Sequence, residues 1–474
     1  MFRRPTAIAL VVVISFAIAS PVGASVATAT TTSGVAGTPT PVPTATQPVD
    51  LGGPHVASAD GSADRDAPRI VVTAVRTPDG PGPAYRVSIT ALDSIDALWV
   101  STTDATVDGS SGVRRSAEGH RFTWDGTADA VRVTVTPDTA PTDGSLAVAG
   151  EDWSFGPVPP LLVAWQTAGG EVRQVRPFEE DAEPFVTVES SDGGLVGEKY
   201  ALVGRSRVAT TATDRGDITL VVPSGVQPRP SAAAVLMALD DAAATFDDGA
   251  GPDDAVVFVL PPTVRSGGAT FVRSDETWIT ADSWVRTANS VWFHEYVHTR
   301  QNFDLGPRMR WFQEASAEYF GARLALETGQ VSSLEYEAYL LGRQHSASVL
   351  TRPETWATDV PYHRGAVVLA ALDEKIRTRT DGKHSLADVF ARLNRHEGTV
   401  TYPVFVAVVN DVAGENMGPW LDRTVAGRAS VGGPAGVTWL FEGASQLAAV
   451  ARTIPLGPGL LVGVGAALAV QWRS

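Results

Sequence analysis

Residues 292–298 of this chain read W-F-H-E-Y-V-H, which contains the pattern H-E-x-x-H. The segment has helical character over roughly residues 283–301, so His294 and His298, four residues apart, fall on one helix face. Two imidazoles at this spacing can share one metal ion, and Glu295 lies within reach of a water bound to that metal. The pattern therefore predicts a zinc-activated hydrolase. The alternative is a pair of surface histidines that lie beside a glutamate by chance.

A third protein ligand is expected downstream, because catalytic zinc takes three protein ligands and keeps one position open for water. The candidate is Glu314, sixteen residues after His298, in the stretch W-F-Q-E-A-S-A-E-Y-F at residues 311–320. Glu318 follows one turn later, where its carboxylate can accept the outer N–H of a ligand histidine and fix the tautomer. Two alternatives stay open: Glu318 is the ligand in place of Glu314, or both glutamates form a solvated stripe. The aromatic and small neighbours favour a half-buried helix.

Two further stretches follow in order along the chain. Residues 362–373 read Y-H-R-G-A-V-V-L-A-A-L-D, and residues 380–388 read T-D-G-K-H-S-L-A-D. With these motifs, residues 195–427 resemble the gluzincin metallopeptidases, most closely the glycyl-aminopeptidase-like branch (peptidase family M61). That branch carries an H-E-Y-x-H helix, a W-F-x-E-G-x-x-x-Y helix, and a tyrosine shortly before a glycine that opens a further helix.

The resemblance implies a zinc metallopeptidase with a thermolysin-like catalytic domain. Zn²⁺ would be held by the two histidines of the pattern and by the third-ligand glutamate, while Glu295 would act as general base and then as general acid. The hydroxyl of Tyr362 would donate to the oxyanion of the tetrahedral intermediate, helped by Arg364 or His363. The alternative for Tyr362 is a core aromatic residue at the start of a helix.

The chain departs from the branch before the metal helix. Residues 266–271 read S-G-G-A-T-F, where the branch has an edge strand of the type G-G-x-E. In related aminopeptidases an acidic residue on that strand holds the free amino group of the substrate. Gly267 and Gly268 could still align a substrate through their backbone. Endopeptidase or short-peptide cleavage is therefore as well supported as aminopeptidase action. A second, minor departure is Ala315, where the branch usually has glycine.

The composition excludes some classes of partner. The net charge is −16, there are no cysteines, and the lysines are Lys199, Lys375 and Lys383 only. An acidic surface of this kind repels nucleic acid, so no nucleic-acid partner is expected. It is typical of salt-adapted, halophilic proteins, although a genome of high GC content also favours arginine over lysine. Without cysteine, no disulfide framework holds the chain.

Both ends of the chain favour a location at the cell surface. Arg3 and Arg4 precede an apolar run and small residues, which predicts a signal peptide over residues 1–29; a retained membrane anchor is the alternative. Residues 454–471 are apolar and precede Trp472 and Arg473, so a transmembrane anchor is expected after a linker over residues 428–453. A buried hairpin or a processed tail signal is the alternative there. The catalytic part would then be secreted across the membrane and anchored to it.

The middle of the chain predicts an α+β protein. Residues 30–67 are rich in Thr, Pro and Ala and predict a disordered stalk, and residues 68–188 carry short alternating runs typical of a β-sandwich. Residues 195–427 would form the catalytic domain, with a mixed sheet and a helical C-terminal half.

Three functions are therefore compatible with the sequence. The first is a cell-surface zinc peptidase that acts on a peptide or protein substrate. The second is a catalytically inactive gluzincin-like protein that binds or adheres at the surface, and the third is a zinc hydrolase for non-peptide amides or esters. The substrate and the oligomeric state stay undetermined.

Overall fold

The computed structural model describes residues 67–431, apart from residues 78–79, 118, 139–145, 180–181, 183–184, 250–253, 265–266, 272, 342–347 and 358. The predicted signal peptide, the stalk up to residue 66, most of the linker and the predicted anchor over residues 454–471 lie outside this part. Within the described part, no helix combines the length and the apolar character that crossing a membrane requires.

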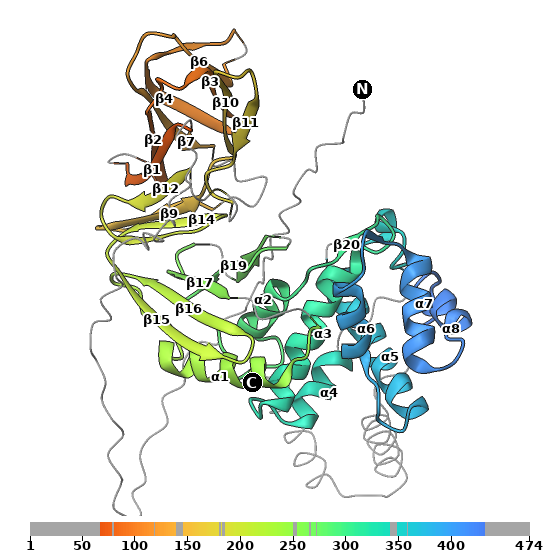
Figure 1. Ribbon diagram of the computed structural model, residues 1–474. Helices are drawn as coiled ribbons and strands as arrows, with labels where there is room; N and C mark the ends of the chain where they lie inside the picture. The colour runs from red at the N-terminus through yellow and green to blue at the C-terminus, as the bar shows by residue number, and fades with distance from the viewer. Residues whose placement is uncertain are drawn as a thin grey trace, which may run out of the picture. The chain divides into compact units, whose positions relative to one another are not determined.

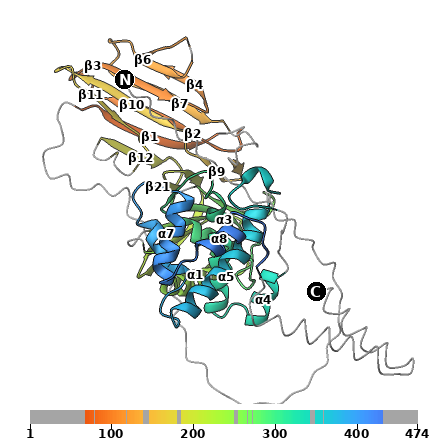
Figure 2. The same ribbon diagram turned by 90° about the vertical axis from the view of Figure 1, so that its right-hand side faces the viewer.

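The N-terminal part is built from two five-stranded sheets. One has the order β12-β1-β2-β7-β4 and the other the order β11-β10-β3-β6-β5 (Figures 1 and 2). Alternate residues of the long strands are buried, as the alternating sequence predicts, and side chains from both sheets form one apolar cluster. The strand bounds are β1 Arg69–Arg76, β2 Pro83–Thr90, β3 Ile95–Thr102, β4 Ala105–Ser111, β5 Val113–Arg115, β6 Arg121–Trp124, β7 Val131–Pro137, β10 Leu161–Thr167, β11 Val172–Val175 and β12 Val186–Ser190.

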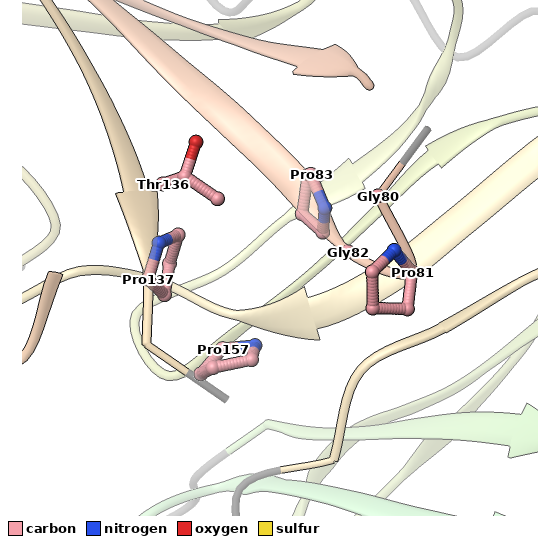
Figure 3. A pocket seen from close by; sticks show the side chains of 7 residues that line it. All are labelled: Gly80, Pro81, Gly82, Pro83, Thr136, Pro137 and Pro157. Carbon is pink, nitrogen blue, oxygen red and sulfur yellow. The ribbon is translucent and has the colours of Figure 1, made fainter. Parts of the chain in front are cut away.

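A small pocket lies in this N-terminal part (Figure 3). Its lining consists of glycines, prolines and one threonine, namely Gly80, Pro81, Gly82, Pro83, Thr136, Pro137 and Pro157. None of these described residues carries an acidic or basic side chain.

A third sheet crosses the boundary that the sequence predicts between the two domains. It has the order β13-β14-β9-β8, with bounds β13 Gly194–Val196, β14 Tyr200–Gly204, β9 Trp153–Pro157 and β8 Val148–Ala149. Strand β14 is buried along its whole length. Its residues alternate between two apolar cores: Tyr200 and Leu202 belong to the larger C-terminal cluster, Ala201 and Val203 to the N-terminal one. One strand thus contributes side chains to both apolar cores.

The C-terminal part begins with a mixed sheet of order β15-β16-β17-β19-β18. The pairs β16–β17 and β17–β19 are parallel, while β15–β16 and β18–β19 are antiparallel, as expected for a mixed sheet. Helix α1 connects β16 to β17. The bounds are β15 Ser206–Thr213, β16 Gly216–Pro223, α1 Ala232–Thr245, β17 Ala255–Leu260, β18 Gly268–Thr270 and β19 Glu276–Thr280.

Helices make up most of the rest, which confirms the α+β class. Helix α2 contacts β18 and β19 on one side and α3 on the other, and α3 in turn packs against η3 and α5 (Figure 1). The bounds are α2 Val291–Thr299, α3 Trp311–Glu327, α4 Ser333–Leu341, η2 Pro353–Thr355, η3 Pro361–Gly365, α5 Ala366–Arg379, α6 Leu386–Asn394, α7 Tyr402–Ala413 and α8 Gly418–Thr424, with a short parallel pair β20 Asp304–Leu305 and β21 Thr399–Val400.

Candidate metal centre

Helix α2 carries the two histidines inside the protein. It is shorter than the expected 283–301, because it begins only after Ser290, its N-cap residue, and ends at Thr299. The residues from Trp292 to Thr299 are all buried, so no face of this helix is solvated. The accessible fraction is 5% for His294 and 7% for His298. This rules out the alternative of two surface histidines.

Helix α3 approaches α2 closely at a glycine. A Cβ atom at Gly321 would lie 3.1 Å from the backbone N of His294 and 3.2 Å from its Cα, so a side chain there would press α2 away by a few tenths of an ångström. The close approach brings the first turn of α3, with Glu314, against the end of α2. Glu314 is 5% exposed, which excludes a solvated acidic stripe.

Three donor atoms converge between the two helices. The Nε2 atoms of His294 and His298 are 3.0 Å apart, and Glu314 Oε2 lies 3.5 Å from the first and 3.2 Å from the second. Three ligands at about 2.0–2.1 Å from a tetrahedral zinc would be separated by about 3.3 Å. The donor set and its spacing therefore fit a zinc ion, and these are the only described residues that form such a group of histidine and acidic side chains.

The outer nitrogen of His294 contacts the carboxylate predicted for this role. Glu318 Oε2 lies 3.1 Å from His294 Nδ1, so the ring presents Nε2 to the other donors. The second oxygen of Glu318 accepts a hydrogen bond from the hydroxyl of Tyr339 on α4. Glu318 thus faces away from the donor triangle, which favours Glu314 as the ligand.

The charges in this cluster depend on one another. Burial alone would lower the pKa of His294, but hydrogen bonds to Glu314 and Glu318 raise it to about 10. Burial alone would raise the pKa of Glu314, yet the charge of His298 and hydrogen bonds from both histidines hold it well below its usual range. The negative charge of these buried carboxylates favours a positive charge at the donor atoms, which a divalent cation would supply.

Glu295 points toward β18 rather than toward the glutamates. Its Oε2 accepts a 2.7 Å hydrogen bond from the hydroxyl of Thr270, while its Oε1 is buried without a hydrogen-bond partner. A Cβ atom at Gly268 would lie 2.7 Å from Glu295 Cγ and 2.9 Å from Oε1, so glycine there makes room for the carboxylate. Burial raises the pKa of Glu295, and the neighbouring histidines and Thr270 partly offset this. Oε2 of Glu295 is thus fixed by Thr270, while Oε1 is available to accept a hydrogen bond or a proton.

Tyr362 enters the site from η3. Its ring stacks on that of His294, with ring centroids 6.0 Å apart and an angle of 22° between the planes. Burial, the charge of Glu314 and a hydrogen bond to that carboxylate raise the pKa of the Tyr362 hydroxyl, which therefore stays protonated. A Cβ atom at Gly365 would lie 2.5 Å from Ala315 Cβ, so this glycine lets η3 approach α3. Tyr362 is therefore at the site and is not merely a core aromatic residue.

Two expected substrate contacts have other partners. The guanidinium of Arg364 donates to the backbone carbonyls of Thr424, 2.9 Å, and Ala429, 3.0 Å, so it braces the segment after α8. The amide and carbonyl of Gly267 both pair with Thr280, and its φ of +116° explains the need for glycine. Arg364 and Gly267 thus have contacts within the protein, and Gly268 lies beside Glu295; a contact of any of the three with substrate stays a prediction. His363 Nδ1 lies 3.2 Å from Asp359 Oδ2.

Sequence reasoning missed three residues that contact the site, namely Thr270, Gln301 and Tyr339. Thr270 lies in the stretch 266–271 quoted above. Its position on the strand expected beside the metal helix could have indicated that it contacts the site. Tyr339 and Gln301 belong to no sequence motif, and their contacts with the site arise only from tertiary packing.

The fold is similar to that of known peptidases. The chain overlays on an aminopeptidase N family protein from Idiomarina loihiensis with a TM-score of 0.54, 14% identity and 77% of each chain covered. An M1 zinc metallopeptidase from Deinococcus radiodurans gives 0.46 and 17%, over 78% of this chain and 94% of that one. Aminopeptidase A from Legionella pneumophila gives 0.43 and 10%, over 75% and 49%. No family model and no curated protein matches the chain. The first overlay shows a shared mixed α+β fold with a β-rich N-terminal domain and a helical C-terminal part.

Proposed function

We propose that this protein is a zinc metallopeptidase that hydrolyses peptide bonds. The observation that carries the proposal is the convergence of His294 Nε2, His298 Nε2 and Glu314 Oε2 within 4.8 Å, beside a buried carboxylate with one unpartnered oxygen. The fold shared with an aminopeptidase N family protein supports the same class. The order of the W-F-x-E helix and the Tyr362 segment supports the finer proposal of a place near the glycyl-aminopeptidase-like branch.

In the proposed mechanism, zinc bound by the three ligands would supply a Lewis acid that activates water and polarises the scissile carbonyl. Glu295 Oε1 takes the proton of the attacking water and passes it to the leaving amine. Thr270 keeps Oε2 occupied, so the proton goes to one defined atom. Tyr362, which stays protonated, donates its hydroxyl hydrogen bond to the developing oxyanion.

The alignment of substrate is proposed to involve β18. This strand is at the edge of its sheet, paired only with β19 among the described strands. An extended peptide can add to such an edge through its backbone. Residues 268–270 read Gly-Ala-Thr and include no acid to hold a free amino group, so endopeptidase and aminopeptidase action both remain candidates. Cleavage of the same peptides with free and with acetylated amino termini separates the two.

The experiment that tests the proposal is the Glu295→Gln variant. The amide cannot accept a proton, so we expect hydrolysis of a peptide library, measured in high salt, to fall by about 10² to 10⁴-fold while zinc stays bound. A chelator should abolish the wild-type activity, and added zinc should restore it. Wild-type turnover by the variant would remove Glu295 as the base.

We also propose that the catalytic part lies outside the cell membrane. The support comes from the sequence alone, namely the patterns at residues 1–29 and 454–471. Both segments lie outside the described residues. Protease treatment of intact cells would degrade an exposed catalytic part. Its survival in intact cells, with digestion after lysis, would contradict the proposal.

A further inference from the structure

Gln301 connects the two ligand helices beside the metal centre. It lies two residues beyond the end of α2 and is 5% exposed. Its Oε1 is 2.9 Å from His298 Nδ1, on the side of the ring that faces away from Glu314. Its Nε2 donates to the carbonyl of Gln313 at 2.8 Å and to the hydroxyl of Ser316 at 2.9 Å, both in the first turns of α3.

These contacts fix the orientation of the amide. The carbonyl of Gln313 can only accept a hydrogen bond, so the Gln301 atom beside it must be the NH₂ group. The amide oxygen then has to face His298, which must donate from Nδ1–H. An imidazole that binds a metal is neutral, so with its proton on Nδ1 it would offer the metal the lone pair of Nε2, the atom that faces His294 Nε2 and Glu314 Oε2.

The two histidines are therefore oriented by chemically different partners. His294 has a carboxylate, Glu318, behind its ring. His298 has a neutral amide whose other end is attached to the helix that supplies Glu314. One side chain thus sets the tautomer of one ligand and the distance from that ligand to another.

We infer that Gln301 is a positioning residue for the metal centre, which holds His298 in the Nδ1–H tautomer and fixes α2 against the start of α3. This inference rests on the proposed zinc site. It assigns Gln301 no contact with substrate.

The variants Gln301→Leu and Gln301→Glu separate the two roles. Leucine removes the acceptor for His298 and the donors to α3. Glutamate keeps an acceptor for His298 but places an oxygen opposite the Gln313 carbonyl. The zinc dissociation constant is measured by competition with a chromogenic chelator, and the visible spectrum of the cobalt-substituted protein reports the ligand geometry. Gln330→Leu, on the turn after α3, is the matched control.

We expect Gln301→Leu to weaken zinc binding by about 10- to 100-fold and to change the cobalt spectrum, as is usual for loss of such a partner. Gln301→Glu should bind zinc more tightly than Gln301→Leu, while both variants lose stability as apoproteins. Gln330→Leu should bind zinc like the wild type. Wild-type affinity and spectrum in folded Gln301→Leu would overturn the inference. A wild-type protein that binds no zinc would instead contradict the proposed function.

Discussion

At the level of single residues, the two oxygens of Glu295 have different surroundings. Oε2 is held by Thr270, and Oε1 is buried without a partner. A base whose free oxygen is already oriented needs little reorganisation when water arrives. The threonine lies on β18, so this strand orients the proposed base through a side-chain hydrogen bond.

This contact makes a prediction for Thr270→Val. The substitution removes a hydrogen bond to a charged group, worth about 1.5–3 kcal/mol, so kcat should fall by about 10- to 100-fold. KM and bound zinc should change little, because Thr270 touches none of the three ligands. Steady-state kinetics and zinc analysis measure both effects.

Thr270→Ser is the matched control, since serine keeps the hydroxyl. Its kcat should stay within a few-fold of wild type, on the scale of a retained hydrogen bond. Equal losses in the serine and valine variants would show that packing, rather than the hydroxyl, matters at this position.

The ligand residues could be predicted from sequence because their relation is local. His294 and His298 share a face through helix geometry alone, and Glu314 and Glu318 repeat the same spacing one helix later. Gln301 could not be predicted, because its role depends on which of its amide atoms faces Gln313. Arg364 was expected beside an oxyanion because it is a basic residue next to Tyr362, but its bonds to carbonyls at the end of α8 and beyond could not be predicted, since they depend on tertiary packing.

At the level of helices and strands, glycines set the spacing around the site. Gly321 brings α3 to α2, and Gly365 brings η3 to α3. The second contact joins Gly365 to Ala315, the residue after the candidate ligand Glu314. The start of α2 was predicted too early, since the hydroxyl of Thr287 donates to the side chain of Asn289 just before the helix, and such local bonds compete with the helical backbone.

The contact between η3 and α3 makes a prediction for Gly365→Ala. The added methyl would meet Ala315 Cβ at 2.5 Å, so the free energy of unfolding should fall by about 1–3 kcal/mol. The displacement of η3 should also lower kcat through Tyr362, with zinc retained. Denaturant unfolding and kinetics measure the two effects.

Ala315→Gly provides the matched background. It removes the methyl that Gly365→Ala would meet, at a cost of about 1 kcal/mol from the lower helix propensity of glycine. Gly365→Ala should therefore cost less in this background than in the wild type. Additive losses would contradict the close contact as the cause.

At the level of the whole chain, β14 links the two apolar cores, and Glu276 on β19 secures its start. The Glu276 carboxylate accepts backbone N–H bonds from Glu198, Lys199 at 3.2 Å and Tyr200 at 2.9 Å. A Cβ atom at Gly197 would lie 2.2 Å from Glu276 Oε1, so glycine leaves space for the carboxylate. The β-rich part was predicted from alternation, but this link was not, because the strand is buried on both faces.

The link makes a prediction about pH. Burial, partly offset by the backbone N–H groups, raises the pKa of Glu276 from 4.5 to about 7. A raised pKa means that the contribution to stability is complete below pH 4.5 and is lost as the pH rises through about 7. We compare the free energies of unfolding of the wild type and of Glu276→Gln. The wild-type value minus the variant value should fall by about 3 kcal/mol between pH 4.5 and about pH 7. Parallel pH profiles for the two proteins would contradict the assignment.

The most direct measurement is the zinc content of the purified full-length chain, compared with that of two variants. The wild type and Glu295→Gln should each retain about one zinc per chain after dialysis, whereas Glu314→Gln should lose it, because of these two glutamates only Glu314 supplies a ligand atom. A wild type that binds no zinc, or a Glu314→Gln variant that binds it as tightly, would contradict the account.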